Sequence, residues 1–213
     1  YNFVSTLNGR FCFVNLVSLR YYSTMSDNAS AIIADRIIHL AWQSCSAEGG
    51  CEHELSGAQW AAVRFLARSN AISRKPSAFA EFHGTTRGTA SQTLKSLASA
   101  GLAQREKDGR DARSVRFSLT EAGERIALND PVLRLKNAVQ SLPDEQRETL
   151  SRLIGQLSCS LSETGENPCF GCCHDCIHFA PQQNDLHEGS CLLEEQATQV
   201  EDPNALCVYF EPD

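Results

Sequence analysis

The stretch from residue 57 to residue 120 constrains the fold most, because three helical patterns separated by chain breaks are followed there by two short strands. Apolar spacing predicts helices over about 57–69, 77–83 and 87–100. Each pattern begins beside a residue that favours a helix start, namely Ser56, Pro76 and Thr86. The last two patterns each end at a glycine, Gly84 and Gly101. Two helices joined by a tight turn are therefore predicted, packed on a third.

A β-hairpin is predicted directly after these helices. Residues 102–106 and 114–120 have the character of strands, and they flank a polar, basic tip over 107–112. The second strand is apolar at every other position, so one of its faces points inward. The predicted fold class is mainly α with a small β-hairpin wing, which is a winged helix-turn-helix in which one helix enters the major groove of DNA.

The charge of the chain is divided sharply along its length. The net charge is -7, yet residues 56–120 hold eleven Lys and Arg against four Asp and Glu, a local charge of +7. Residues 158–213 hold eleven acids and no Lys or Arg, a local charge of -11. Phosphate is attracted only by the first block, so a nucleic-acid site is expected there.

The outer face of the helix over 87–100 supplies the predicted base and phosphate contacts. Arg87 and Lys95 suit phosphates or guanine edges, and Gln92 suits adenine. Thr89 and Ser91 are small enough to allow close approach to DNA. The alternative is a polar face that is merely solvated; the ordered set of elements and the local positive charge favour DNA binding.

The segment from Asp108 to Gly123, DGRDARSVRFSLTEAG, resembles the wing signature of MarR-family regulators, and TRGTAS from Thr86 resembles their recognition helix. The resemblance covers about residues 30–160. It implies an obligate homodimer, built from the first and the last two helices, on a pseudo-palindromic operator. By the same resemblance Arg110 and Arg113 at the tip enter or flank the minor groove of DNA. Asp108 or Asp111 braces these two arginines. Ala112 and Gly88 depart from the family pattern, which leaves the operator sequence open.

Two apolar helical stripes outside the winged helix need a partner surface, and the implied dimer supplies one. The first lies in residues 30–43, and the second, after Pro143, carries Leu150, Leu153, Ile154, Leu157 and Leu161. Residues 158–168 are expected to form a polar linker. We predict three parts: a non-native or upstream extension over 1–24, the DNA-binding and dimerisation domain over 25–160, and a cysteine-rich segment over 161–213.

Seven of the ten cysteines lie in the last quarter of the chain, which favours a metal site. Cys173 and Cys176 form a C-x-x-C pair, and with Cys191 and Cys207 they give four thiolates if the chain folds back twice. Four thiolates hold zinc or an iron–sulfur cluster, and the long separation of the last two favours a [4Fe-4S] cluster. This spacing resembles cluster-binding segments of accessory proteins.

Other residues of the segment leave alternatives open. Cys169 and Cys172 form a second C-x-x-C pair and are reserve ligands. Three histidines compete poorly with so many soft thiolates, namely His174, His178 and His187. Phe179, Tyr209 and Phe210 either shield a cluster or form a small core. Cys12, Cys45 and Cys51 are expected to take no part.

The sequence therefore predicts a cytoplasmic, homodimeric, non-enzymatic repressor that senses redox state, oxygen, nitric oxide or iron through a [4Fe-4S] cluster. The alternatives are a structural zinc module, a thiol–disulfide switch and, more distantly, an iron–sulfur accessory or electron-transfer protein. No secretory signal is expected, and the apolar stretch over 11–19 is shorter than the ~20 residues of a membrane helix. The operator, the target genes, the sign of regulation and the physiological signal stay open.

Overall fold

The computed structural model describes residues 29–45, 55–107, 115–164, 168–182, 185–193, 198–200 and 202–212. The chain divides into two compact units, residues 1–48 and residues 49–213. In the first unit, helix α2 (Ala29–Cys45) confirms the predicted first helix. Its large apolar side chains are exposed, and these are Ile32, Ile33, Ile37, Ile38, Leu40 and Trp42. The second unit contains every other described element.

Three helices begin the second unit at the predicted places: α3 (Gly57–Arg68), α4 (Pro76–His83) and α5 (Arg87–Ser99). Ser56 caps α3 in a capping box with Gln59, because each side chain accepts from the other residue's backbone N–H. Thr86 caps α5 by accepting from the Thr89 N–H. Gly84 ends α4 with φ 61°, a left-handed conformation that glycine adopts without strain. Local capping therefore fixes the turn between α4 and α5.

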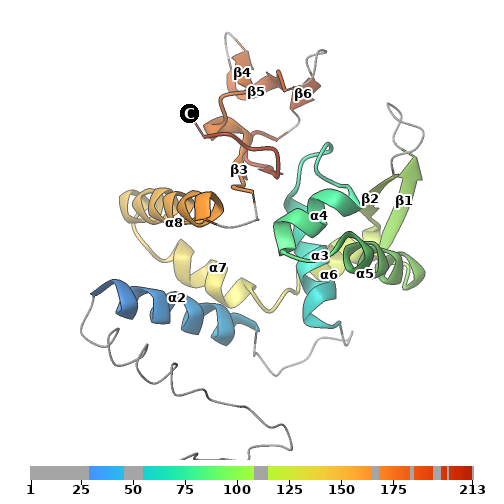
Figure 1. Ribbon diagram of the computed structural model, residues 1–213, viewed down its shortest axis with the longest axis horizontal. Coiled ribbons are helices and arrows are strands. Elements are labelled where there is room, and N and C mark those ends of the chain that lie inside the picture. Colours follow the sequence, from blue (N-terminus) through green and yellow to red (C-terminus); the bar gives the residue numbers. More distant parts are fainter. Residues whose placement is uncertain are drawn as a thin grey trace, which may run out of the picture. The chain divides into compact units, whose positions relative to one another are not determined.

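Strands β1 (Ala103–Lys107) and β2 (Val115–Leu119) pair antiparallel, with Arg105 opposite Phe117. The hairpin stands beside α5 and α6 in Figure 1. The Phe117 N–H donates to the Arg74 carbonyl at 2.9 Å, which ties β2 to the loop before α4. Helix α6 (Glu121–Ala127) then begins at Thr120, whose side chain accepts from the Gly123 N–H. The chain thus forms the predicted winged helix-turn-helix.

A core of aromatic and aliphatic side chains joins these elements. Phe65, Phe79, Phe117, Leu94 and Leu97 are almost completely buried. An ion pair lies beside this core. The Arg64 guanidinium of α3 donates two hydrogen bonds to the buried Asp130 carboxylate, at 2.5 and 2.7 Å. This paired contact anchors the chain that follows α6, because a buried carboxylate is stable only with partners.

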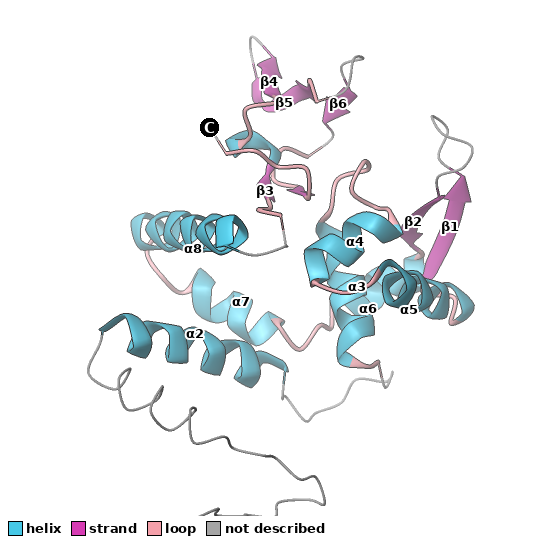
Figure 2. Ribbon diagram, in the orientation of Figure 1, coloured by secondary structure: helices cyan, strands magenta, loops and turns pink. Residues whose placement is uncertain are grey.

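Two further helices follow, α7 (Leu133–Gln140) and α8 (Asp144–Thr164). Figure 2 shows the mainly helical character of this part of the chain. The predicted linker over 158–168 is wrong for residues 158–164, which complete α8. The helix continues because Leu157 and Leu161 extend its apolar i, i+4 stripe past the polar serines. Large apolar side chains of α8 are exposed, and these are Leu150, Leu153, Ile154, Leu157 and Leu161.

The cysteine-rich segment folds into short antiparallel sheets. Strand β3 (Gly171–Cys172) pairs with β7 (Leu206–Cys207). Strand β5 (Asp185–Cys191) lies between β4 (Phe179–Gln182) and β6 (Thr198–Val200). A single 3₁₀ turn, η1 (Cys173–Asp175), links β3 to the second sheet. The chain therefore folds back twice, at β5 and at β7.

This segment packs against the winged helix instead of standing apart from it. Leu206 and Val208 belong to the same buried core as Phe65 and Phe79, and the Phe170 ring lies edge-on to the Phe82 ring at 4.7 Å. The sequence predicts residues 161–213 only as a separate cysteine-rich part, because their apolar residues are too few and too scattered to indicate such a contact.

Candidate functional site

The exposed face of α5 forms one candidate site. Arg87, Thr89, Gln92 and Lys95 are exposed, whereas Ser91 is half-buried. The inward side of the same helix buries Ala90, Leu94 and Leu97, which fixes the rotation of the helix on the core. The Thr89 hydroxyl lies 2.9 Å from the Thr86 hydroxyl and is thus held at the helix start. Four of the five predicted residues on this helix can meet a ligand directly.

The wing adds positive charge beside α5. Arg105 and Lys107 are exposed on β1. The predicted tip residues Arg110 and Arg113, with Asp108 and Asp111, lie outside the described residues. The described strands nevertheless place the two ends of the tip, Lys107 and Val115, opposite each other. The described end of the hairpin therefore carries exposed basic side chains on β1.

A thiol centre forms the second candidate site. A small cavity of about 10 Å³ is lined by Cys173, Cys176, Cys191 and Cys207, together with His178, Phe179, Leu193 and Tyr209. All four cysteines predicted as ligands thus converge, although no group of three or more His, Cys, Asp or Glu in the described part of the chain has the arrangement of a metal site. The space holds about one water-sized sphere.

Strand pairing brings these cysteines together from distant parts of the sequence. Pairing of β3 with β7 sets Gly171 opposite Cys207, and pairing of β4 with β5 sets Phe179 opposite Cys191. The η1 turn holds the C-x-x-C pair, because the Cys176 N–H donates to the Cys173 carbonyl at 3.1 Å. A two-residue ladder and one tight turn therefore position three of the four thiols.

Aromatic rings cover the thiol centre, and two glycines make room for them. A Cβ at Gly171 would lie 2.8 Å from the Phe210 ring, and a Cβ at Gly189 would clash with Phe179. Phe179 and Phe210 pack against the buried cluster of Ile72, Cys173, Val200 and Cys207. Phe179 and Phe210 thus belong to a small core around the thiols, which is one of the two roles expected from the sequence, and the shielding of a cluster stays a prediction.

Two of the thiols interact directly. A hydrogen bond between the Cys173 and Cys207 side chains raises the pKa of Cys173 and lowers the pKa of Cys207 to about 6. Burial raises the pKa of both groups and thus reinforces the first shift and opposes the second. The hydrogen bond thus favours the thiolate form of Cys207 over that of Cys173, and the thiolate is the form that binds metals.

The second C-x-x-C pair is divided between two roles. Cys169 forms a disulfide with Cys159 of α8, so Cys169 is not placed as a reserve ligand. Cys172 stays a thiol, and its pKa is raised by burial, with the Arg68 charge acting in the opposite direction. Neither residue lines the cavity of the thiol centre.

The loop between α3 and α4 contacts the thiol centre, and sequence analysis did not single it out. The Asn70 side chain donates from Nδ2 to the Cys173 sulfur at 3.5 Å. The Ser73 hydroxyl accepts from the Val208 N–H at 3.2 Å. Asn and Ser are ordinary loop residues, so no local pattern distinguishes these two from others.

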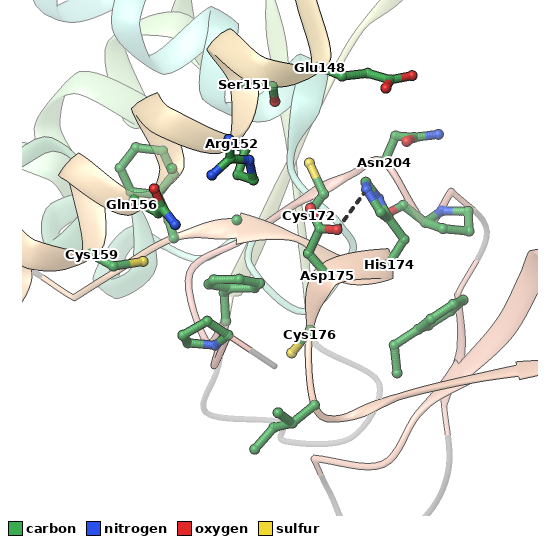
Figure 3. A pocket seen from close by; sticks show the side chains of 18 of the residues that line it. Glu148, Ser151, Arg152, Gln156, Cys159, Cys172, His174, Asp175, Cys176 and Asn204 are labelled. Atoms are coloured by element: carbon green, nitrogen blue, oxygen red, sulfur yellow. Dashed lines mark hydrogen bonds and ion pairs between the residues drawn. The ribbon is translucent and has the colours of Figure 1, made fainter. Parts of the chain in front are cut away.

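A wider groove of about 1510 Å³ lies between α8 and the cysteine segment. Figure 3 shows Arg152 and Gln156 on one side of it and Cys172, His174 and Asp175 on the other. His174 Nε2 lies 3.1 Å from the Asp175 carboxylate. Of the four predicted ligands, only Cys176 also borders this groove.

The geometry defines a winged helix-turn-helix with an attached thiol centre, and comparison with known proteins agrees with the first part. Residues 53–114 match the family model described as the MarR family. No curated protein matches the chain. Among the described residues, no helix has the length and apolar character needed to cross a membrane.

Several solved structures are similar to part of the chain. A mutant of S. aureus MepR is 17% identical, with a TM-score of 0.46, over 63% of this chain and 98% of that chain. Streptococcus pneumoniae FabT in complex with DNA is 16% identical, with a TM-score of 0.47, over 68% and 99%. CouR from Rhodococcus jostii RHA1 bound to p-coumaroyl-CoA is 16% identical, with a TM-score of 0.48, over 62% and 93%. Because each TM-score is below 0.5, we rest no conclusion on them.

Proposed function

We propose that the protein is a DNA-binding transcriptional regulator of the MarR type. The observation that carries this proposal is the exposed row of Arg87, Gln92 and Lys95 on a helix whose other side is locked into a winged-helix core. In the proposed complex, Arg87 and Lys95 contact phosphates or guanines while Gln92 reads a base edge in the major groove. Arg110 and Arg113 of the wing tip extend the contact into the minor groove. No step requires catalysis.

The proposed regulator acts in the cytoplasm as a homodimer on a pseudo-palindromic operator. The apolar stripe of α8 supports the dimer, because five large side chains on it are exposed. Burying them against the same stripe of a second copy would contribute roughly 25 cal/mol per Å² of apolar area. Two recognition helices would then face successive major grooves of one duplex. Repression follows if the operator overlaps a promoter, since the bound dimer blocks it.

We further propose that Cys173, Cys176, Cys191 and Cys207 hold a [4Fe-4S] cluster. The support is their convergence on one cavity shielded by Phe179 and Tyr209. The cavity takes about one water-sized sphere. The thiols must therefore move apart to accept the cluster, and the hydrogen bond between Cys173 and Cys207 must break. Such a cluster exchanges an electron or is dismantled by oxidants, oxygen, nitric oxide or iron shortage, and so gives the regulator its signal.

A second candidate, a thiol–disulfide switch, is favoured by the Cys159–Cys169 bond. That bond joins the end of α8 to the start of the cysteine segment. Its reduction would release a connection between the proposed dimer helix and the thiol centre. The iron–sulfur proposal and this one use different cysteines, and can therefore be separated by substitution.

The test is anaerobic purification of the full chain with determination of iron, sulfide and zinc. We expect a brown protein with iron and sulfide in equal amounts, and loss of visible absorbance in each of the four Cys→Ser variants, C173S, C176S, C191S and C207S. Cys172→Ser is the matched control, since this neighbouring thiol lies outside the cavity. Colourless protein containing zinc would favour the structural zinc module. Metal-free protein whose DNA binding responds to Cys159→Ser would favour the disulfide switch.

DNA binding is tested by selecting duplexes from a random pool with the full chain. We expect enrichment of a two-fold symmetric sequence, bound at a stoichiometry of one dimer per duplex. Recovery of no sequence, together with no binding at low salt, would contradict the regulator and favour an accessory or electron-transfer protein.

A further inference from the structure

The loop over residues 69–75 connects the thiol centre with the DNA-reading unit by direct contacts at both of its ends. At one end Asn70 donates its backbone N–H to the Leu206 carbonyl at 2.9 Å, and Ser69 forms a parallel bridge with Leu206. At the other end the Arg74 carbonyl accepts from the Phe117 N–H of the wing strand β2. The loop therefore touches both β7, which carries Cys207, and the wing.

Internal hydrogen bonds make this loop a defined structure. The Asn70 Oδ1 accepts from the Ser73 N–H at 3.0 Å, and the Arg74 Nε donates to the Ser69 carbonyl at 3.0 Å. Ser69 and Ser73 are fully buried. The first of these bonds also fixes the orientation of the Asn70 amide, because a backbone N–H must face its oxygen. The amide NH₂ consequently faces the Cys173 sulfur.

We propose that Asn70 is a positioning residue for Cys173, and that through it the loop 69–75 links the state of the thiol centre to the wing. The inference rests on the proposed function, because it assumes that Cys173 binds the cluster as a thiolate. An N–H donor beside a thiolate stabilises the negative charge and fixes the direction of the sulfur. Such partners of metal ligands tune both metal retention and reduction potential.

The linkage to DNA follows from the same contacts. The Cys173 sulfur shares a hydrogen bond with Cys207, and a Cys173 sulfur that held a cluster would have to give up that bond. The Asn70 amide must then move with the Cys173 sulfur or lose its hydrogen bond to it. A movement of Asn70 disturbs the Ser73 N–H bond and thus the segment that ends at Arg74, to which β2 is attached. The wing and its basic tip then respond to cluster loss.

The experiment compares three variants of the full chain. Asn70→Asp keeps the oxygen that accepts from the Ser73 N–H but removes the donor to sulfur and adds a negative charge. Asn70→Gln keeps a donor on a longer side chain and serves as the conservative rescue. Asn204→Ala is the matched control, because Asn204 is an exposed asparagine of the cysteine segment whose backbone N–H donates to the Asp202 side chain.

Three properties are measured anaerobically: the rate at which an iron chelator removes the visible absorbance, the reduction potential of the cluster, and the ratio of operator affinity between cluster-loaded and cluster-free protein. For Asn70→Asp we expect absorbance loss on the order of tenfold faster than in the unaltered protein, a lower reduction potential, and an affinity ratio that moves toward one. Asn70→Gln should restore most of the chelator resistance, and Asn204→Ala should match the unaltered protein.

The outcomes separate this inference from the function on which it rests. Unaltered protein without iron and sulfide would overturn the cluster proposal itself. Unaltered protein that holds a cluster, with Asn70→Asp equal to it in chelator resistance, potential and affinity ratio, would overturn the role of Asn70. If Asn70→Asp fails to fold, Asn70→Ala, which removes the donor to sulfur without adding a charge, is compared instead, and a chelator resistance, potential and affinity ratio equal to those of the unaltered protein would overturn the role of Asn70.

Discussion

The helical core and the cysteine segment of the second unit are stabilised in different ways. The core buries large side chains such as Phe65, Phe79 and Leu94, each at most 1% exposed. The separate cluster around the thiols has only Ile72 and Val200 as buried aliphatic residues besides two cysteines, and its strands are short. Strands of this length do not form a stable sheet alone. The core should therefore fold by itself, whereas the segment depends on the core and on whatever its thiols bind.

The largest expected effect comes from a substitution in the core. Phe79→Ala should lower the free energy of unfolding by about 3–5 kcal/mol, because it leaves a cavity among packed aromatic rings. Urea denaturation followed by circular dichroism measures the change. Leu128→Ala is the control, since Leu128 is 73% exposed. If Phe79→Ala unfolded the helices but left the cysteine segment folded, the proposed order of dependence would be contradicted.

Removal of the proposed iron–sulfur cluster tests whether the cysteine segment depends on the group that its thiols bind. Chelation of iron should speed amide hydrogen exchange at Cys191, Val200 and Cys207 by about tenfold or more, since ligand binding stabilises a site by mass action. Exchange in α3 and α5 should change little. Mass spectrometry of peptic fragments measures amide exchange in the cysteine segment and in the two helices. Equal acceleration in helices and segment would show that the two regions unfold as one.

The residues that contact DNA should fall into two kinds: arginines that contribute affinity for any duplex, and Gln92, which contributes sequence preference. Arg110→Ala and Arg113→Ala should weaken binding to all duplexes and reduce the salt dependence, because these side chains neutralise phosphate or groove charge. Gln92→Ala should cost about 1–3 kcal/mol on the selected operator and relax the base preference at one position. Titrations at two salt concentrations distinguish these results. Unchanged affinity in both arginine variants would contradict the role of the wing tip.

The smallest effect concerns a helix cap. Thr86→Ala should destabilise the helical core by about 1 kcal/mol, because the Thr89 N–H loses its acceptor at the start of α5. Thr86→Ser keeps the acceptor and serves as the control. Thermal unfolding measures the change, and the rate of cluster loss should stay as in the unaltered protein. A cluster that became labile in Thr86→Ala alone would show that α5 and the thiol centre are coupled more closely than the loop 69–75 predicts.

Helices and the hairpin were predictable because their signals are local. Ser56, Thr86 and Thr120 act on residues three positions further along, and Gly84 acts at its own position. Two signals conflicted past Ser158: Leu161 continues the apolar stripe, whereas the serines and the glutamate are typical of a linker, and the structure follows the stripe to Thr164. The exposed face of α5 was also predictable, apart from the half-buried Ser91, because helical spacing separates its outer from its inner residues.

The sequence by itself determined which residues are basic, which are thiols and where helices begin, because charge, chemistry and capping belong to single residues or to near neighbours. Only the tertiary structure decided that Cys173 and Cys207 meet, that Cys169 pairs with Cys159, and that Asn70 lies against the thiol centre. These contacts join residues up to 103 positions apart. They depend on strand pairing and on the burial of Leu206 in the helical core, and no local pattern specifies either.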